Sequence, residues 1–221
     1  VVPNGVEIPP LDELPDEEDV PTVIFTGVLS YSPNIEAARW FTEAVWPGVR
    51  GLVPNARFLL AGRSPDEQIT ALARRSGVKV RSDVPDMARE IRRAWMSVAP
   101  MRSGSGIKNK VLEAWAVERP AVLTELATNG LDLDRGSGPG ELICSSAEEM
   151  VDTVTSLLRD HERRRRLGRQ SRAFARERHS WARAGEKLAA VLTGAGLGQP
   201  DTGHLGDGGG GHPPSTAHRA T

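Results

Sequence analysis

The chain has 221 residues, 38% of them hydrophobic and 26% charged, which is enough to bury the core of one domain but not of two. Its 28 basic and 29 acidic side chains nearly cancel, which excludes the overall positive charge of a typical nucleic-acid binder. The single cysteine, Cys144, excludes an intramolecular disulfide and a zinc site built from cysteines, and no apolar run approaches the ~20 residues of a membrane span. We expect a cytoplasmic protein without a bound metal or cofactor.

The two ends of the chain differ in composition from the middle. Residues 1–20 are rich in proline and acidic side chains, as interdomain linkers are, and residues 194–221 are rich in glycine and offer almost nothing to bury. We therefore predict a linker over 1–20, one folded domain over 21–193 and a disordered tail over 194–221. The tail contains His204, His212 and His218, whose setting favours simple disorder over metal binding.

Six short apolar runs alternate with helical patterns between these ends. The predicted strands are 23–27, 56–62, 78–82, 96–101, 120–125 and 141–145. Two helices begin with a predicted capping box, formed by Ser64 with Glu67 and by Ser146 with Glu149, and Pro65 takes the first helical position of the former. Strands that are apolar on both faces and separated by helices form parallel sheets covered on both sides. The pattern predicts a Rossmann-like, doubly wound α/β domain, in which ligands bind beyond the carboxyl ends of the strands.

The turn after the fourth strand departs from local preferences. It reads Arg102-Ser-Gly-Ser-Gly106 and leads into a helix predicted to start near Ile107, with Lys108 and Lys110 in its first turn. A helix N-terminus carries partial positive charge, so each lysine there costs roughly 0.3–1 kcal/mol unless an anion is bound. The glycines would let backbone N–H groups approach a phosphate, and the basic side chains would supply further positive charge. The conflict therefore predicts a phosphate site.

Glu113 lies further along the same helix, on one face with Asn109 and Lys110. A carboxylate adds nothing to an anion site, but it accepts hydrogen bonds from vicinal ribose hydroxyls, so the combination indicates a nucleoside diphosphate. An ordinary surface pair of Lys110 and Glu113 beside a plain glycine loop remains the alternative. Only Gly27 follows the first strand and no P-loop motif occurs, which argues against a dinucleotide dehydrogenase and a P-loop NTPase.

Four segments carry a resemblance to a known family. They are VVPNGVE (1–7), FTGVLSYSPNIEAARWF (25–41), VRSDVPDMARE (80–90) and GSGIKNKVLEAWAVERPAVLTELATNGL (104–131), the last matching G-x-G-x-x-x-K-x-x-E-A-x-A-x-x-x-P-V-V-x-T. Over roughly residues 1–192 the chain resembles the C-terminal, donor-binding domain of group 1 (family 4) retaining glycosyltransferases of the GT-B fold, in particular the bacterial exopolysaccharide subgroup. This resemblance implies the C-terminal half of a GT-B fold.

In that family the glutamate before Ala-x-Ala binds the donor's ribose, and basic residues upstream bind its diphosphate. The donor-binding residues that the resemblance implies are Gly27, Arg102, Gly104, Ser105, Gly106, Ile107, Lys108, Lys110 and Glu113, with Asp83, Val84 and Pro85 in the loop beside the base. The chain departs from the family at two places. Ser105 stands where many members have a glutamate near the sugar, and the turn after Gly27 lacks their arginine and lysine.

The resemblance implies transfer of a sugar from a nucleoside diphosphate sugar to an acceptor hydroxyl with retained configuration, in polysaccharide or glycoconjugate synthesis. No protein nucleophile is implied, and Lys108, Lys110 and Arg102 would stabilise the leaving diphosphate. The acceptor site belongs to an N-terminal domain that this chain lacks, so we expect donor binding without catalysis in isolation. Two alternatives are a nucleotide-sugar epimerase, for which the Gly-Ser-Gly turn offers no acid or base, and a stand-alone, non-catalytic nucleotide-sugar-binding module.

The remaining features have structural interpretations. The arginine-rich stretch 161–179 is expected to be a solvated helix face with intrahelical pairs, and its alternatives are peripheral attraction to the inner face of an anionic membrane and binding of nucleic acid. His161 and His179 are expected at the surface. The five tryptophans fall at helical positions or helix ends, where we expect core packing rather than sugar stacking.

Overall fold

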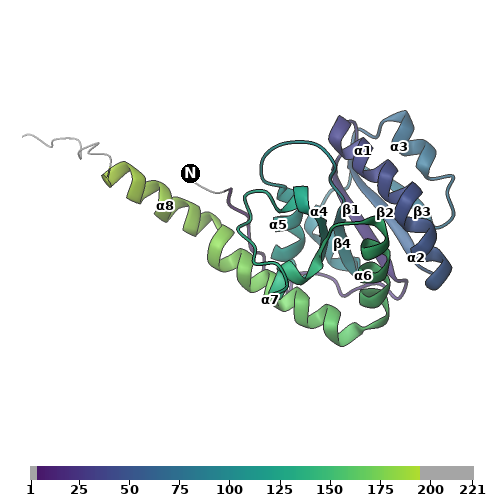
Figure 1. The fold of residues 1–221 in the computed structure, drawn as a ribbon. Coiled ribbons are helices and arrows are strands. Elements are labelled where there is room, and N and C mark those ends of the chain that lie inside the picture. The colour runs from purple at the N-terminus through teal and green to yellow at the C-terminus, as the bar shows by residue number, and fades with distance from the viewer. Residues whose placement is uncertain (1–3, 195–221) are drawn as a thin grey trace, which may run out of the picture.

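Six parallel strands form a sheet in the order β3-β2-β1-β4-β5-β6 (Figure 1). The computed structural model describes residues 4–194. The strands are β1 (Thr22–Val28), β2 (Arg57–Arg63), β3 (Val78–Ser82), β4 (Met96–Ala99), β5 (Ala121–Thr124) and β6 (Ile143–Cys144). The order reverses between β1 and β4, and such a reversal is where ligands bind in doubly wound sheets. Residues 195–221 of the predicted tail, with its three histidines, lie outside the described residues.

Helices cover both faces of the sheet. They are α1 (Ser32–Trp40), the π-helical turn η1 (Phe41–Val45), α2 (Trp46–Leu52), α3 (Glu67–Leu72), α4 (Met87–Arg93), α5 (Asn109–Ala116), the 3-10 turns η2 (Glu125–Thr128) and η3 (Gly138–Leu142), α6 (Ala147–Arg159), α7 (His161–His179) and α8 (Trp181–Gly194). Helix α6 contacts α2 and η1, whereas α5 contacts α4 and α7. The strands between these two groups are buried, so their sequences are apolar on both faces.

This arrangement confirms the predicted Rossmann-like α/β fold, and each predicted strand occurs within two residues of its observed bounds. The capping box at α6 is also confirmed, because the N–H of Glu149 donates to the Ser146 hydroxyl at 3.1 Å. The one predicted at Ser64 is wrong. Ser64 has a φ of 51°, and α3 starts later because Asp66 caps it by accepting a hydrogen bond from the N–H of Gln68.

The segment predicted as a linker packs along the domain. Val6 bridges to Ser180 between α7 and α8, and its N–H donates to the carbonyl of His179 at 2.7 Å. Further along, Glu17 accepts a hydrogen bond from Arg164 at 3.0 Å. The prediction of a surface position is wrong for His179, which is 3% exposed and whose ring lies 5.8 Å from that of Phe174. His161 is exposed, as expected.

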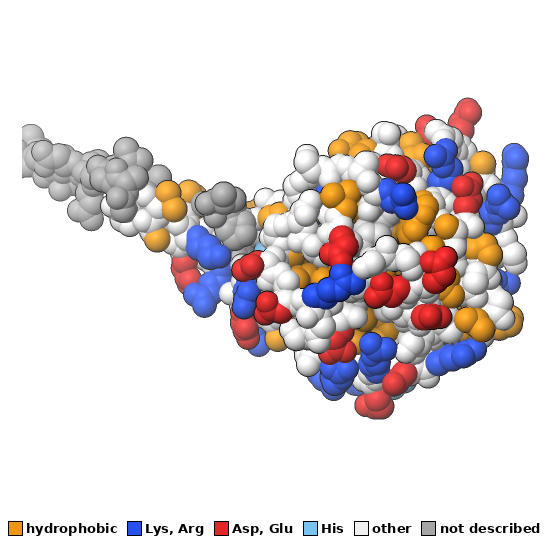
Figure 2. All heavy atoms as spheres, viewed as in Figure 1, with side chains coloured by type: hydrophobic (Ala, Val, Ile, Leu, Met, Phe, Trp, Pro, Cys, Tyr) orange, Lys and Arg blue, Asp and Glu red, His pale blue; other side chains and the backbone are white. Residues whose placement is uncertain are grey.

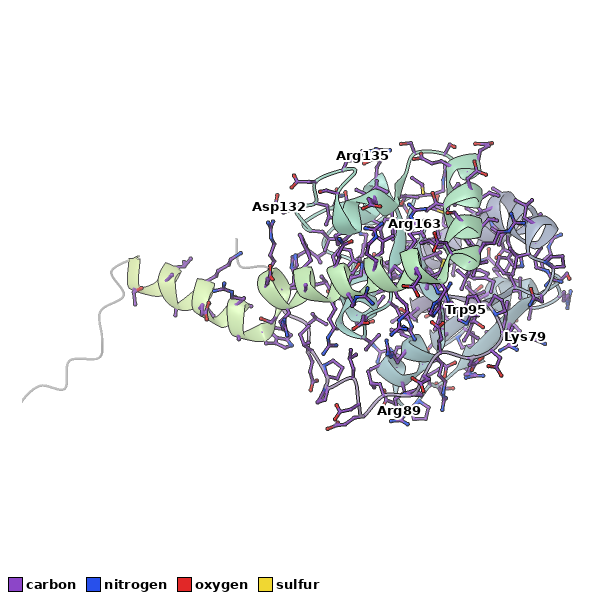
Figure 3. All side chains as sticks on the ribbon, turned by 90° about the horizontal axis from the view of Figure 1, so that it is seen from below. Lys79, Arg89, Trp95, Asp132, Arg135 and Arg163 are labelled. Atoms are coloured by element: carbon purple, nitrogen blue, oxygen red, sulfur yellow. The ribbon has the colours of Figure 1, made fainter. Side chains whose placement is uncertain are left out.

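Helix α7 runs along the underside of the domain, where Figure 3 shows it beside Trp95. The guanidinium of Arg164 lies 4.1 Å from the centre of the Trp95 ring, and Arg172 donates to the carbonyl of Pro9 at 2.7 Å. Arg166 pairs with Glu141 of η3. The expected intrahelical pairing therefore gives way to contacts with other elements, so much of the basic charge of this helix holds the fold together.

Helix α8 projects from the body of the domain (Figure 1), and Figure 2 shows hydrophobic side chains along it. Trp181 is 64% exposed, and Leu188 and Val191 are exposed as well. Trp181 thus departs from the expected core packing of the tryptophans, whereas Trp46 and Trp115 are buried as expected. The described helices include none long and apolar enough to cross a membrane.

Candidate functional site

A cavity of about 240 Å³ lies at the carboxyl ends of β1 and β4, where the strand order reverses. The turn between β1 and α1 forms one wall and the loop between β4 and α5 forms the other. The lining residues are Gly27, Tyr31, Pro33, Asn34, Met101, Gly104, Ser105, Ile107, Lys108, Asn109, Lys110 and Glu113. Most of the donor-binding residues expected from the sequence therefore meet in one place.

The loop between β4 and α5 curls against the start of α1. Gly104 and Gly106 have φ values of 93° and 77°, which other residues rarely adopt, and a Cβ on Gly104 would lie 3.3 Å from Pro33. Helix α5 begins at Asn109, two residues later than expected, with Lys108 at the N-cap. The side chain of Lys108 turns back toward the loop, and its ammonium donates to the carbonyls of Gly104 and Ser105 at 3.0 Å each. Lys108 therefore closes the loop on itself, and burial lowers its pKa.

Lys110 is the most unusual group of the cavity. Its side chain is 9% exposed, and its ammonium donates to the amide oxygen of Asn34 at 2.6 Å and lies 3.9 Å from the centre of the Phe25 ring. Within the described part of the chain it forms no ion pair. Burial lowers the pKa of Lys110 to about 7, while the charge of Glu113 raises it and that of Lys108 lowers it. The alternative of an exposed Lys110–Glu113 surface pair is therefore wrong.

Glu113 separates this cavity from a larger one of about 570 Å³. Asn109 and Glu113 line both cavities, and the larger one extends between α4, α5, Trp181 and the segment that runs from Gly5 to Leu14. The Glu113 side chain is exposed to solvent, yet its carboxylate sits in a concave wall, and this partial desolvation raises its pKa. A ligand could thus contact Lys110 and Glu113 at once.

Other expected residues lie outside the smaller cavity. The guanidinium of Arg102 stacks 5.2 Å from the centre of the Trp40 ring and lines a separate cavity with Thr124. Gly106 shapes the loop without lining the cavity, and the loop of Asp83, Val84 and Pro85 precedes Asp86, which lines the larger cavity. No cluster of three potential metal ligands occurs among residues 4–194.

Comparisons with known proteins identify the family of the chain. Residues 20–160 match the family model described as "Glycosyl transferases group 1". The chain belongs to this glycosyltransferase family. No curated protein sequence matches the chain significantly.

Solved structures of GT-B glycosyltransferases share the fold at low sequence identity. Staphylococcus aureus TarM, solved as a point mutant in a complex that includes UDP, is 17% identical with a TM-score of 0.69, and the match covers 85% of this chain and 38% of TarM. Sucrose-phosphate synthase from Thermosynechococcus elongatus is 16% identical with a TM-score of 0.66, over 88% of this chain and 52% of the synthase. Anabaena Alr3699/HepE, solved with UDP and glucose, is 14% identical with a TM-score of 0.61, over 78% of this chain and 48% of Alr3699/HepE. The chain thus spans about half or less of these glycosyltransferases.

Two parts of the site cannot be predicted from the sequence. Asn34 belongs to the segment FTGVLSYSPNIEAARWF (25–41), but only the fold brings its side chain to Lys110, 76 positions away. The wall of the larger cavity that Gly5 to Leu14 form has no sequence signal, because linker composition does not tell where a segment packs. In this chain, both features depend on long-range contacts.

Proposed function

We propose that this chain is the donor-binding, C-terminal domain of a retaining glycosyltransferase, and that its smaller cavity binds the diphosphate of a nucleoside diphosphate sugar. The observation that carries the proposal is the buried ammonium of Lys110, which has no carboxylate partner within the described residues. A buried cation without a counterion is costly, and a bound diphosphate would supply the missing negative charge. TarM and Alr3699/HepE, each solved with UDP, support this ligand class.

The position of Glu113 supports the assignment of the ribose. Its carboxylate borders both cavities, so a diphosphate at Lys110 would place the ribose hydroxyls near Glu113 and direct the base toward the larger cavity. We propose that the loop of Asp83, Val84 and Pro85, which precedes Asp86 in that cavity's wall, flanks the base. A carboxylate that accepts from both hydroxyls of a ribose favours ribonucleotides over 2′-deoxyribonucleotides.

The mechanism that we propose relies on electrostatics rather than on a protein nucleophile. As the bond between the sugar and the diphosphate breaks, negative charge grows on the leaving oxygen, and a fixed cation at Lys110 stabilises that charge. The leaving oxygen would take the proton of the acceptor hydroxyl, so the reaction would need no base from this chain. The acceptor, of a polysaccharide or glycoconjugate, would bind to an N-terminal domain, so this chain alone would bind donor without transferring sugar.

The exposed apolar face of α8, formed by Trp181, Leu188 and Val191, supports a contact with that second domain. It projects from the body beside Gly5, where the N-terminal segment reaches the domain. Exposed apolar patches of this kind mark interaction sites. Co-expression with the missing domain should protect the backbone amides of α8 from hydrogen exchange, and unchanged exchange would contradict the contact.

A nucleotide-sugar epimerase is less well supported. Glu113 is the one carboxylate among the described residues that line the smaller cavity, and no histidine joins it. Lys108 and Lys110 are hydrogen-bonded to loop carbonyls and to Asn34, whereas epimerisation needs a free acid and a free base at the sugar. A stand-alone binding module would use the same site, so the missing domain rather than this site separates it from a transferase. Sugar transfer by the full-length enzyme, absent in a Lys110→Met variant, would distinguish the two.

We also propose a cytoplasmic location, in which contact with an anionic membrane would rest on Arg165 and Arg169 of α7. These two exposed arginines, like Arg176 further along the helix, make no ion pair or hydrogen bond within residues 4–194. Sedimentation with phosphatidylglycerol vesicles, compared between the native chain and an Arg165→Gln/Arg169→Gln variant, tests this contact. Equal sedimentation of the two proteins would exclude it.

Calorimetric titration with UDP, GDP and their sugars tests the donor site directly. We expect binding of at least one of them, and no heat with any of them would refute the site. Glu113→Ala should weaken binding roughly 10- to 100-fold, because a charge-assisted hydrogen bond contributes about 1.5–3 kcal/mol, and should abolish the preference for UDP over 2′-deoxy-UDP. Glu43→Ala, an exposed glutamate of η1 away from the cavity, is the matched control and should leave binding unchanged.

A further inference from the structure

Asn34, the third residue of α1, has both ends of its side-chain amide committed. Asn34 is only 6% exposed. Its amide nitrogen donates to the carbonyl of Val28 at 2.8 Å, and its amide oxygen accepts from the ammonium of Lys110 at 2.6 Å. The nitrogen can only donate and the ammonium can only donate, so the two bonds fix the orientation of the amide. Asn34 thus connects the end of β1 to the cation of α5.

A neutral amide at this place has an electrostatic consequence. The other groups in contact with the ammonium are the sulfur of Met101 at 3.8 Å and the ring of Phe25 at 3.9 Å, neither of which carries a charge. The charges of Glu113 and Lys108 also act on Lys110, but neither residue forms an ion pair with it within the described residues. An aspartate in place of Asn34 would pair with the ammonium and neutralise it, although it could not donate to the carbonyl of Val28. The asparagine holds the amine in position without pairing its charge, so an anion in the cavity can pair with the protonated form.

Gly27 leaves room for this connection. Its φ is 147°, and a Cβ there would lie 2.8 Å from the amide nitrogen of Asn34 and 3.4 Å from the ammonium of Lys110. A side chain at residue 27 would therefore push the amide away from Val28 and Lys110. The end of β1, the amide and the ammonium meet at one point beside the cavity.

We propose that Asn34 is a positioning residue of the donor site, which fixes the ammonium of Lys110 beside Gly27 without neutralising it. The inference rests on the proposed function for its consequence in nucleotide binding, but its geometry can be tested without any nucleotide. The ligand that this arrangement favours is a diphosphate, because a diphosphate binds more tightly to a cation that is not already paired with a protein carboxylate.

The first experiment measures the pKa of Lys110 in the full chain by NMR, with isotope-labelled lysine. The chain has only four lysines, so the side-chain resonances are readily assigned by substitution. Asn34→Asp should raise the pKa of Lys110 from about 7 to about 8 or higher, because a carboxylate would replace a neutral acceptor at hydrogen-bonding distance. Asn55→Asp, in an exposed loop before β2, is the matched control and should leave it unchanged.

The second experiment compares UDP binding by the same proteins. Asn34→Asp should weaken binding about tenfold or more although Lys110 is more fully protonated, because the new carboxylate both neutralises the ammonium and repels the diphosphate. Damage that exposes Lys110 to water would also raise its pKa, because burial is what lowers it. Asn34→Ala separates the two causes: damage would raise the pKa in both variants, whereas the effect of a carboxylate appears in Asn34→Asp alone.

Gly27→Ala provides a second variant in case Asn34→Asp does not fold. It keeps the asparagine but displaces its amide, so it should also change the pKa of Lys110. An unchanged pKa of Lys110 in every variant that folds would overturn the positioning role. Failure of the native chain to bind any nucleotide, together with the expected pKa changes, would refute the proposed function and leave the positioning role supported.

Discussion

Replacement of Lys110 by methionine tests the electrostatic basis of the site through stability alone. The pKa of this lysine falls from 10.5 to about 7 on folding, which corresponds to roughly 5 kcal/mol of destabilisation when the group is charged in both states. The unfolded chain binds the proton more tightly, so the native protein gains stability as the pH rises from about 7 to about 10.5. Methionine does not titrate, so Lys110→Met removes this dependence.

The expected magnitude follows from the same values. Between about pH 6.5 and pH 9 the native chain should gain roughly 2.5 kcal/mol relative to Lys110→Met. At about pH 6.5 the variant should be more stable by on the order of 2 kcal/mol, after a cost of about 1–3 kcal/mol for leaving the oxygen of Asn34 without a donor. The stability advantage of Lys110→Met should nearly vanish at about pH 9. The variant should fail to bind nucleotide at both pH values.

Urea denaturation at a series of pH values measures both effects. Lys79→Met, which replaces an exposed lysine of β3 labelled in Figure 3, is the matched control and should track the native chain at every pH. A difference between the native chain and Lys110→Met that stays constant from about pH 6.5 to pH 9 would refute the reasoning, because Lys110 would then keep an ordinary pKa in the folded protein.

Three further measurements test the site and the fold. UDP binding at about pH 8, where Lys110 is mostly neutral, should take up close to one proton, because the diphosphate restores its charge, and calorimetry in buffers of different ionisation enthalpy measures this uptake. Glu17→Ala should destabilise the fold by about 2–3 kcal/mol in urea denaturation, because it leaves the buried Arg164 without its carboxylate. Gly62→Ala should cost about 3 kcal/mol or more by the same assay, because its Cβ would lie 1.8 Å from the carbonyl oxygen of Gly27.

Each of these has a matched control. The Lys79→Met variant, which keeps Lys110, should take up the same proton as the native chain, and equal heats in both buffers for the native chain would contradict a neutral Lys110. Glu7→Ala, at an exposed position in the same N-terminal segment, should stay within about 0.5 kcal/mol of the native chain. Gly51→Ala should be neutral or slightly stabilising, because a Cβ there meets nothing within 4 Å and Gly51 lies in α2. Equal losses for Gly51→Ala and Gly62→Ala would contradict the steric argument.

The sequence by itself determined the parallel α/β sheet, because a strand buried on both faces must be a continuous apolar run, and such runs are visible without coordinates. It also located the turn after β4, since glycines followed by lysines at a helix start conflict with the helix dipole. The cap of α6 was equally legible, because a capping box depends on residues three positions apart. All of these are local or periodic properties of the chain.

Only the tertiary structure decided how the charges of the site are paired. Lys110 could have been a surface lysine next to Glu113, and its burial depends on Phe25 and Asn34, which belong to another strand and helix. The path of the N-terminal segment and the burial of His179 likewise depend on contacts across more than a hundred residues. Desolvation and hydrogen bonding between distant residues have no sequence period, and they set the pKa of Lys110 and thereby the chemistry of the cavity.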